Sequence, residues 1–177
     1  QVLRQHARHV DTGEPMPEAL IDKLRRARRF GQGFATVSYA SCVLLDMSLH
    51  RHQAPDSLDP DAFERAELSR LNMPRAMVMR HRPPHFGHLF AGESYAAGYY
   101  VYLWAEVLDA DGFEAFVEAG DVFDPACAQR LQRYVYSAGN LRDPALAFRL
   151  FRGRDPSVQP MLEQRGFAIE PQVRTAA

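Results

Sequence analysis

The stretch FAGESYAAGYYVYLWAEV, residues 90–107, holds four of the chain's seven tyrosines together with two glycines and a pair of alanines. Its composition predicts a helix from about Ser94 to Leu108. Residues spaced i, i+4, i+7 lie on the same side of a helix, so Tyr95, Tyr99 and Tyr102 are expected to share one face. A helix with a stripe of three phenols requires an explanation in packing or in function.

Both explanations remain open from these residues alone. Ordinary packing, in which each hydroxyl finds a hydrogen-bond partner, is one of them. The preceding segment, residues 85–94, contains two histidines and two glycines that allow a mobile turn. Neutral donors beside a flexible loop are what an acyl-transfer site needs to hold a developing oxyanion. Glu106 extends the tyrosine face, whereas Tyr100 and Trp104 project elsewhere and are expected in the core.

The rest of the chain is typical of helices joined by short loops. Asp-Pro pairs at residues 124–125 and 143–144 mark helix starts, and prolines at 74, 83 and 84 keep residues 73–87 extended or looped. Further helices are expected at 1–9, 17–27, 31–50, 62–71, 113–117 after an Asp-Gly break, 124–136, and from 143 and 157 onward. No segment alternates with period two. The predicted fold class is therefore all-α, with residues 1–177 forming a single helical domain.

The composition excludes several classes of protein. The chain has 177 residues, 46% hydrophobic and 24% charged, so it can bury a core, and disorder is not expected. A formal net charge of -1 gives no attraction to nucleic acid or to anionic lipid. No apolar run reaches the roughly 20 residues that span a bilayer, and no signal peptide opens the chain. Cys42 and Cys127 are interpreted as buried thiols in a reducing cytoplasm.

The histidines do not predict a metal site. His81, His85 and His88 are spaced i, i+4, i+7, but Pro83 and Pro84 prevent the helix that would bring them together. There is no H-E-x-x-H motif and no G-x-S-x-G nucleophile motif. We therefore assign no metal ligand to this chain. Because the chain starts at Gln1 with no initiator methionine and with an apolar spacing typical of a helix in progress, we interpret it as a fragment of a longer protein.

Several stretches together resemble the C-terminal part of the thimet-oligopeptidase family of zinc metallopeptidases, in particular its bacterial peptidyl-dipeptidase and oligopeptidase A branch. The matching stretches are 12–15, 31–37, 79–90, 95–108 and 151–156. The resemblance implies an all-helical part of a catalytic domain, in one half of a two-lobed enzyme whose deep channel admits only short, unstructured peptides. It also implies that the zinc-binding helix and the glutamate that activates water precede Gln1 and are missing here.

The resemblance implies roles for individual residues. His88 and Tyr102 would donate hydrogen bonds to the oxyanion of the tetrahedral intermediate. Tyr99 would line the substrate site, and Tyr95 with the loop 90–94 would close over the peptide backbone. Removal of the Tyr102 hydroxyl is therefore expected to lower turnover more than substrate binding.

The substrate-binding loop departs from the family pattern. Many members have two adjacent glycines before the first tyrosine, whereas this chain has Gly92-Glu93-Ser94, which stiffens the turn and places an acid near the site. A peptidyl-dipeptidase also binds the C-terminal carboxylate of its substrate, and Arg80 or Arg82 can do so as a bidentate donor. Arg82 is included among the candidate substrate-binding residues with Gly92, although an arginine beside prolines can equally pin the loop.

The leading hypothesis is therefore the C-terminal part of a cytoplasmic zinc oligopeptidase that acts on short peptides. This part is expected to supply substrate-binding and oxyanion residues, to bind no zinc itself, and to be inactive without the missing N-terminal part. The alternative is a non-catalytic helical module that binds peptides or has a structural role. Self-association is a further possibility, because a domain separated from its other half exposes apolar surface.

Overall fold

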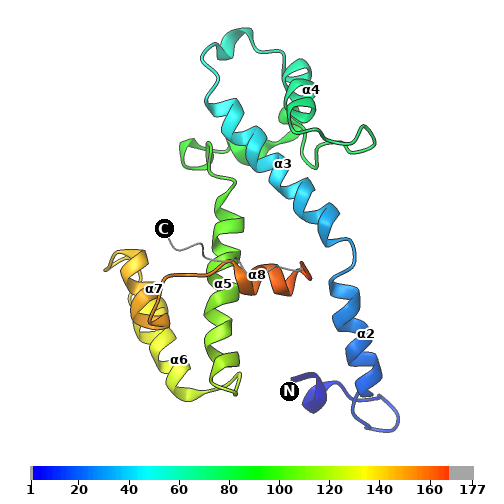
Figure 1. Cartoon of the computed structure of the whole chain (residues 1–177), viewed down its shortest axis with the longest axis vertical. Coiled ribbons are helices and arrows are strands. Elements are labelled where there is room, and N and C mark those ends of the chain that lie inside the picture. The colour runs from blue at the N-terminus through cyan, green and yellow to red at the C-terminus, as the bar shows by residue number, and fades with distance from the viewer. Residues whose placement is uncertain (1, 168–177) are drawn as a thin grey trace, which may run out of the picture.

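The computed structural model describes residues 2–167, and its architecture confirms the all-α prediction (Figure 1). The helices are α1 (Val2–His6), α2 (Glu18–Arg28), α3 (Gln32–His50), α4 (Pro60–Arg70), α5 (Val101–Glu118), α6 (Pro125–Leu131), α7 (Pro144–Arg152) and α8 (Gln159–Gln164). Short 3₁₀ turns are η1 (Pro55–Ser57), η2 (Pro83–His85), η3 (Gly87–Phe90) and η4 (Glu93–Tyr95), and a π-helical turn, η5 (Gln132–Tyr136), continues α6. Over the same residues the only β-type pairing is an isolated bridge between Arg8 and Pro15.

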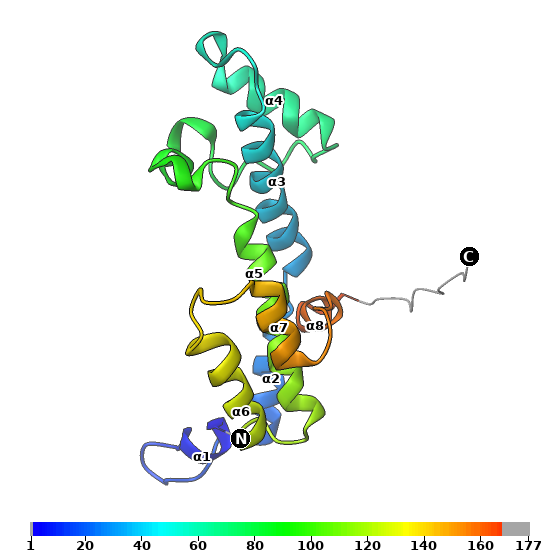
Figure 2. The same ribbon diagram turned by 90° about the vertical axis from the view of Figure 1, so that its left-hand side faces the viewer.

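The helices form an elongated arrangement rather than a rounded bundle. Helices α2 and α3 follow one another along an arm, and α3 passes close to the start of α5 (Figure 1). Helix α4 lies at the far end of α3, whereas α6, α7 and α8 gather around the later part of α5 (Figure 2). The segment 71–100 therefore connects two groups of helices and lies where α3 meets α5.

Each group of helices has its own apolar cluster. Near α3, the buried members come from the helix and from the loop that follows α4; they are Cys42, Leu45, Met79, Phe86 and Leu89. Around α5, α6 and α7, the buried members are Ala115, Phe116, Cys127 and Phe151. The first cluster lies directly under the tyrosine stretch, because Tyr99 packs against it.

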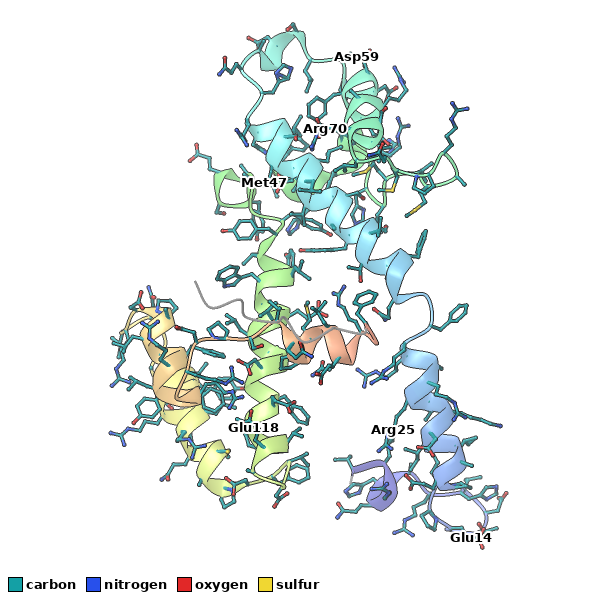
Figure 3. All side chains as sticks on the ribbon, viewed as in Figure 1. Glu14, Arg25, Met47, Asp59, Arg70 and Glu118 are labelled. Carbon is teal, nitrogen blue, oxygen red and sulfur yellow. The ribbon has the colours of Figure 1, made fainter. Side chains whose placement is uncertain are left out.

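Aspartate caps begin three of the helices, two of them where the Asp-Pro pairs at 124–125 and 143–144 predicted. Asp59, labelled at the start of α4 in Figure 3, accepts the Asp61 amide at 2.9 Å. Asp124 accepts the Cys127 amide at 2.7 Å at the start of α6. Asp143 accepts the Leu146 amide at the start of α7. In each case proline follows the cap, where its missing N–H costs nothing.

A buried carboxylate joins α5 to the end of α7 and the segment beyond it. Asp111 has no exposed surface and accepts hydrogen bonds from Arg152, from Arg154 and from the Ser157 amide at 2.6–3.3 Å. Burial opposes its ionisation, but the hydrogen bonds from Arg154, Ser157 and Arg152 outweigh burial and hold the pKa of Asp111 below its ordinary value. Glu118, labelled in Figure 3, pairs with the same Arg152 at 2.8 Å.

The predicted start of the tyrosine helix is wrong. Helix α5 begins at Val101, not at Ser94, because Ala96 is extended and Ala97 has a φ of 55°, in the left-handed region. Gly98 follows in a tight turn, where a Cβ would approach the Tyr95 carbonyl oxygen to 3.2 Å. The predicted break before residues 113–117 is also wrong, since α5 runs continuously to Glu118 and tolerates one interior glycine.

The surface exposes large apolar side chains. The accessible surface is 13127 Å², whereas a compact monomer of this length exposes about 8,700 Å². Trp104 and Tyr100 were expected in the core, and this prediction is wrong, since they are 63% and 49% exposed. Phe30 is 91% exposed in the middle of the α2–α3 connection. Among the described helices, none has the length and apolar character needed to cross a membrane.

Candidate functional site

The candidate site lies where the loop 79–100 passes between α3 and the start of α5. Three short 3₁₀ turns, η2, η3 and η4, bend this loop back on itself. Prolines at positions 83 and 84 start the first turn. Met79, Phe86 and Leu89 anchor the loop, because they belong to the apolar cluster near α3. The loop therefore presents its histidines beside the tyrosines that follow.

Three tyrosines surround one histidine. The ring of His88 lies 4.7 Å from that of Tyr95, 5.8 Å from that of Tyr99 and 5.9 Å from that of Tyr102, measured between centroids. The Tyr102 hydroxyl is 3.1 Å from His88 Nε2, within hydrogen-bond distance. Sequence reasoning expected the three phenols on one helix face, but they come from η4, from the loop and from the first turn of α5. The turn between η4 and α5, and not a continuous helix, therefore brings the three tyrosines together around His88.

A tyrosine of α3 fixes the start of α5. The Tyr39 hydroxyl donates a short hydrogen bond to the Tyr99 carbonyl oxygen and accepts one from the Leu103 amide at 3.2 Å. Its ring packs against that of Tyr99 with 5.2 Å between centroids, and Phe86 meets Tyr99 edge-on at 4.8 Å. Burial raises the pKa of both Tyr39 and Tyr99 above the ordinary phenol value. Tyr99 is thus held on two sides.

These residues line an open pocket of about 450 Å³. Its walls are formed by Tyr39, Arg80, His81, His85, Phe86, Gly87, His88, Tyr99 and Tyr102. The polar side chains of this set are three phenols, three imidazoles and one guanidinium, all able to donate hydrogen bonds, and the set contains no carboxylate. The pocket therefore suits a ligand that carries negative charge or develops it during reaction.

The two candidate arginines occupy different environments. Arg82 donates to Glu64 at 2.9 Å and to Asp61 at 2.6 Å, so it ties the loop to α4. Glu64 is buried, so Arg82 compensates a carboxylate that is shielded from water. Arg80 instead lines the pocket. The geometry favours the loop-pinning interpretation of Arg82 and leaves Arg80 as the guanidinium that lines the pocket.

Gly92 lies in the turn between η3 and η4. Its φ is 171°, an extended conformation that any residue can adopt, and a Cβ there would meet only the Tyr95 ring, at 4.0 Å. The backbone at this position does not depend on glycine. Glu93 follows it and begins η4.

Comparison with known proteins identifies the family. The sequence model for peptidase family M3 matches residues 1–167. The chain belongs to peptidase family M3. It is 38% identical over 171 residues to dipeptidyl carboxypeptidase of Escherichia coli, an alignment that covers 96% of this chain and 25% of the relative. It is 38% identical over 159 residues to oligopeptidase A of Escherichia coli, with 89% and 23% covered.

The family M3 match extends to eukaryotes. Saccharolysin of Saccharomyces cerevisiae is 28% identical over 159 residues, which are 89% of this chain and 22% of the relative. The chain spans about a quarter of the length of the relatives that it matches. The resemblance to the thimet-oligopeptidase family is thus confirmed over nearly the whole chain.

The described histidines of this family M3 chain do not form a cluster of metal ligands. Within residues 2–167, no three histidine, cysteine, aspartate or glutamate side chains lie close enough together to hold a metal ion. His81, His85 and His88 share the pocket, but they project from different parts of a proline-interrupted loop.

Sequence reasoning missed the contribution of α3 to the site. Tyr39, Asp46 and His50 are spaced i, i+7, i+11 and lie on one face of this helix, where they contact the residues before and at the start of α5. Polar side chains repeated on one face of an otherwise apolar helix were a signal available in the sequence.

Proposed function

We propose that this chain is the substrate-binding part of a zinc peptidase that hydrolyses short peptides, as a peptidyl-dipeptidase or oligopeptidase. The observation that carries the proposal is the pocket in which Tyr102 and His88 meet, which is lined by hydrogen-bond donors and by no carboxylate. The printed names of the relatives support the same class of reaction. Zinc and the residue that activates water are proposed to come from another part of the same polypeptide, and we use "complete enzyme" for the chain joined to that part.

The Tyr102–His88 pair is suited to stabilise an oxyanion. When an amide carbonyl is attacked, negative charge develops on its oxygen, and donors already aimed at that position lower the barrier. A His88 whose Nε2 carries a proton donates to the Tyr102 oxygen at 3.1 Å, which leaves the phenol O–H free to donate to the substrate. Tyr102 is 49% exposed, so its hydroxyl is accessible to a peptide.

The neighbouring residues are proposed to bind the peptide. Tyr99 lines the pocket, and Tyr95 lies against His88 at its edge, where the loop 90–94 with Gly92 can close over the substrate. Arg80 replaces Arg82 as our candidate for the C-terminal carboxylate, because Arg82 is already paired with Glu64 and Asp61. A guanidinium binds a carboxylate through two parallel hydrogen bonds.

The proposal is tested by hydrolysis of a short internally quenched peptide. We expect the complete enzyme to cleave it and this chain alone not to, because its described residues supply no metal site. Cleavage by this chain alone would refute the division of roles. A complete enzyme that is loaded with zinc and cleaves no short peptide would refute the peptidase assignment itself.

A non-catalytic helical module is the second candidate. The same pocket of about 450 Å³ can bind a peptide without hydrolysing it. The exposed apolar side chains also support self-association of the isolated chain, which size-exclusion chromatography over a range of concentrations would reveal.

The free thiols Cys42 and Cys127 support a reducing compartment, for which we propose the cytoplasm. We retain the proposal of one domain, since the 71–100 segment packs on α3 and leads directly into α5.

A further inference from the structure

A fully buried carboxylate of α3 holds the backbone that carries the tyrosines. Asp46 has no exposed surface. Its Oδ1 accepts the Ala97 amide at 3.1 Å, and its Oδ2 accepts the Tyr99 amide at 2.9 Å. Both amides belong to the turn between η4 and α5, where no helical carbonyl is available to them. Asp46 thus supplies acceptors to a backbone segment 51 and 53 residues away.

The turn that Asp46 holds is conformationally demanding. Ala97 has a φ of 55°, a region that residues with a Cβ adopt only when their surroundings impose it. Hydrogen bonds to an ionised carboxylate are roughly twice as strong as those to a neutral acceptor. Such bonds on both sides of Gly98 restrict the turn at the point where the chain changes direction into α5.

His50 completes the environment of the carboxylate. Its Nδ1 lies 2.8 Å from Asp46 Oδ1, and because the carboxylate can only accept, this nitrogen carries the proton and donates. The Ala97 amide, 3.3 Å from the same nitrogen, is then left to Asp46. Oδ1 consequently accepts from two donors and Oδ2 from one. With no exposed surface, Asp46 cannot contact a substrate or act as a base.

Tyr39 extends the same contact one turn further along the chain. It occupies the same face of α3 as Asp46 and bonds the Tyr99 carbonyl and the Leu103 amide. The N–H and the C=O of Tyr99 are therefore both held by α3, one by Asp46 and the other by Tyr39. Rotation of the Tyr99 peptide units would break one of these bonds.

We propose that Asp46, supported by His50, is a positioning residue that sets the direction of Tyr99 and Tyr102 toward His88. It fixes the amides of residues 97 and 99, and α5 begins two residues later with Tyr102 in its first turn. Displacement of this turn moves the two phenols relative to the imidazole. The expected effect on kcat rests on the proposed function, whereas the hydrogen bonds from Asp46 to the backbone do not depend on it.

Asp46→Asn tests the role with almost no change in shape. One oxygen becomes an NH₂ group, which must face either the Tyr99 amide or the donors at Oδ1, so at least one hydrogen bond is replaced by two opposed donors. In the complete enzyme we expect kcat to fall about 10- to 100-fold with KM within about threefold, because a shift near 1 Å in a catalytic group costs up to about 10² in rate.

Asp111→Asn is the matched control. Asp111 is equally unexposed and accepts more hydrogen bonds, but its partners are Arg152, Arg154 and Ser157 in the distant group of helices. Its loss is expected to lower the melting temperature and to leave kcat per folded molecule unchanged at a temperature where circular dichroism shows both variants folded. An equal fall in kcat for both variants would assign the Asp46 effect to general destabilisation and overturn the proposal.

A second readout does not depend on activity. Amide protons that donate to a carboxylate resonate downfield, so the NMR signals of Ala97 and Tyr99 in this chain are expected to move upfield in Asp46→Asn and not in Asp111→Asn. Unchanged signals would overturn the proposal even where the complete enzyme proves inactive. If the complete enzyme fails to hydrolyse peptides while these signals move, the proposed function is wrong and the contact is right.

His50→Gln covers the case in which Asp46→Asn does not fold. This variant removes only the imidazole that orients the carboxylate and leaves both amide bonds possible. We expect kcat to fall a few-fold with KM unchanged. Unchanged kcat in a folded His50→Gln enzyme, together with an unfolded Asp46→Asn variant, would give Asp46 a purely structural role and overturn the proposal.

Discussion

Removal of the Tyr102 hydroxyl separates the catalytic role of this residue from its packing role. In Tyr102→Phe the ring remains against Tyr99, 5.5 Å between centroids, and the hydroxyl loses only its bond to His88 among the described residues. The side chain is half exposed, so a lost neutral hydrogen bond costs about 0.5–1.5 kcal/mol of stability. Removal of an oxyanion donor costs about 10²–10³ in kcat, or about 2.7–4 kcal/mol. The kinetic loss is therefore expected to exceed the stability loss severalfold.

The assay is steady-state hydrolysis of a short internally quenched peptide by the complete enzyme. We expect kcat to fall by about 10²–10³ with little change in KM, because the hydroxyl acts on charge that develops only in the transition state. Melting followed by circular dichroism measures the accompanying change in stability.

Tyr100→Phe is the control for the loss of a phenol oxygen. Tyr100 is 49% exposed, the same fraction as Tyr102, and lies two residues before it, but its side chain does not line the pocket. We expect its kcat to stay within about twofold of the parent enzyme. A kcat for Tyr102→Phe within about threefold of the parent, or an equal loss in both variants, would refute the oxyanion assignment.

Four further predictions concern charge. Arg80→Gln should raise KM about 10-fold or more for peptides with a free C-terminal carboxylate and leave C-terminally amidated peptides unaffected; equal effects on both would exclude the carboxylate role. Arg82→Gln should instead lower stability in urea by about 1–3 kcal/mol, because Glu64 would stay buried without its partner, with KM unchanged as the contrasting readout. The lowered pKa of Asp111 stabilises the fold above about pH 4, and this contribution should be lost as the pH falls below that value, so urea midpoints of the parent should drop in acid and those of Asp111→Asn should drop less. Zinc added to this chain alone should not change its melting temperature, since residues 2–167 bring no three ligands together, and a saturable increase would contradict this.

The helices could be predicted because their signals are local. An aspartate at the cap with proline after it specifies a start regardless of what surrounds it, and α6 and α7 begin where residues 124–125 and 143–144 indicated. The apolar run of α3 likewise specified a long helix. Such signals can be interpreted without knowledge of the tertiary contacts.

The tyrosine stretch could not be placed correctly because its conformation depends on tertiary contacts. The sequence Ser94-Tyr95-Ala96-Ala97 favours a helix by propensity, and alanine is the best helix former. The acceptors on α3 override that preference and hold Ala97 in the left-handed region. The prediction that Tyr100 and Trp104 lie in the core was wrong for a related reason. The sequence shows that a side chain is apolar, but it does not show which other residues, if any, pack against it.

The site thus depends on two different kinds of information. His88, Tyr99 and Tyr102 could be selected from the sequence as candidate site residues, because histidines and tyrosines are rarely concentrated in so short a segment. Their geometry is decided by Tyr39, Asp46 and His50 on α3, which carry no motif and are separated from the tyrosines by about fifty residues. A buried carboxylate must find donors, and because the backbone amides of its own helix are already hydrogen bonded, α3 offers Asp46 only the side chain of His50. The remaining acceptor positions of Asp46, on the buried face of α3, are filled by free amides of a non-helical segment, the turn at residues 96–99.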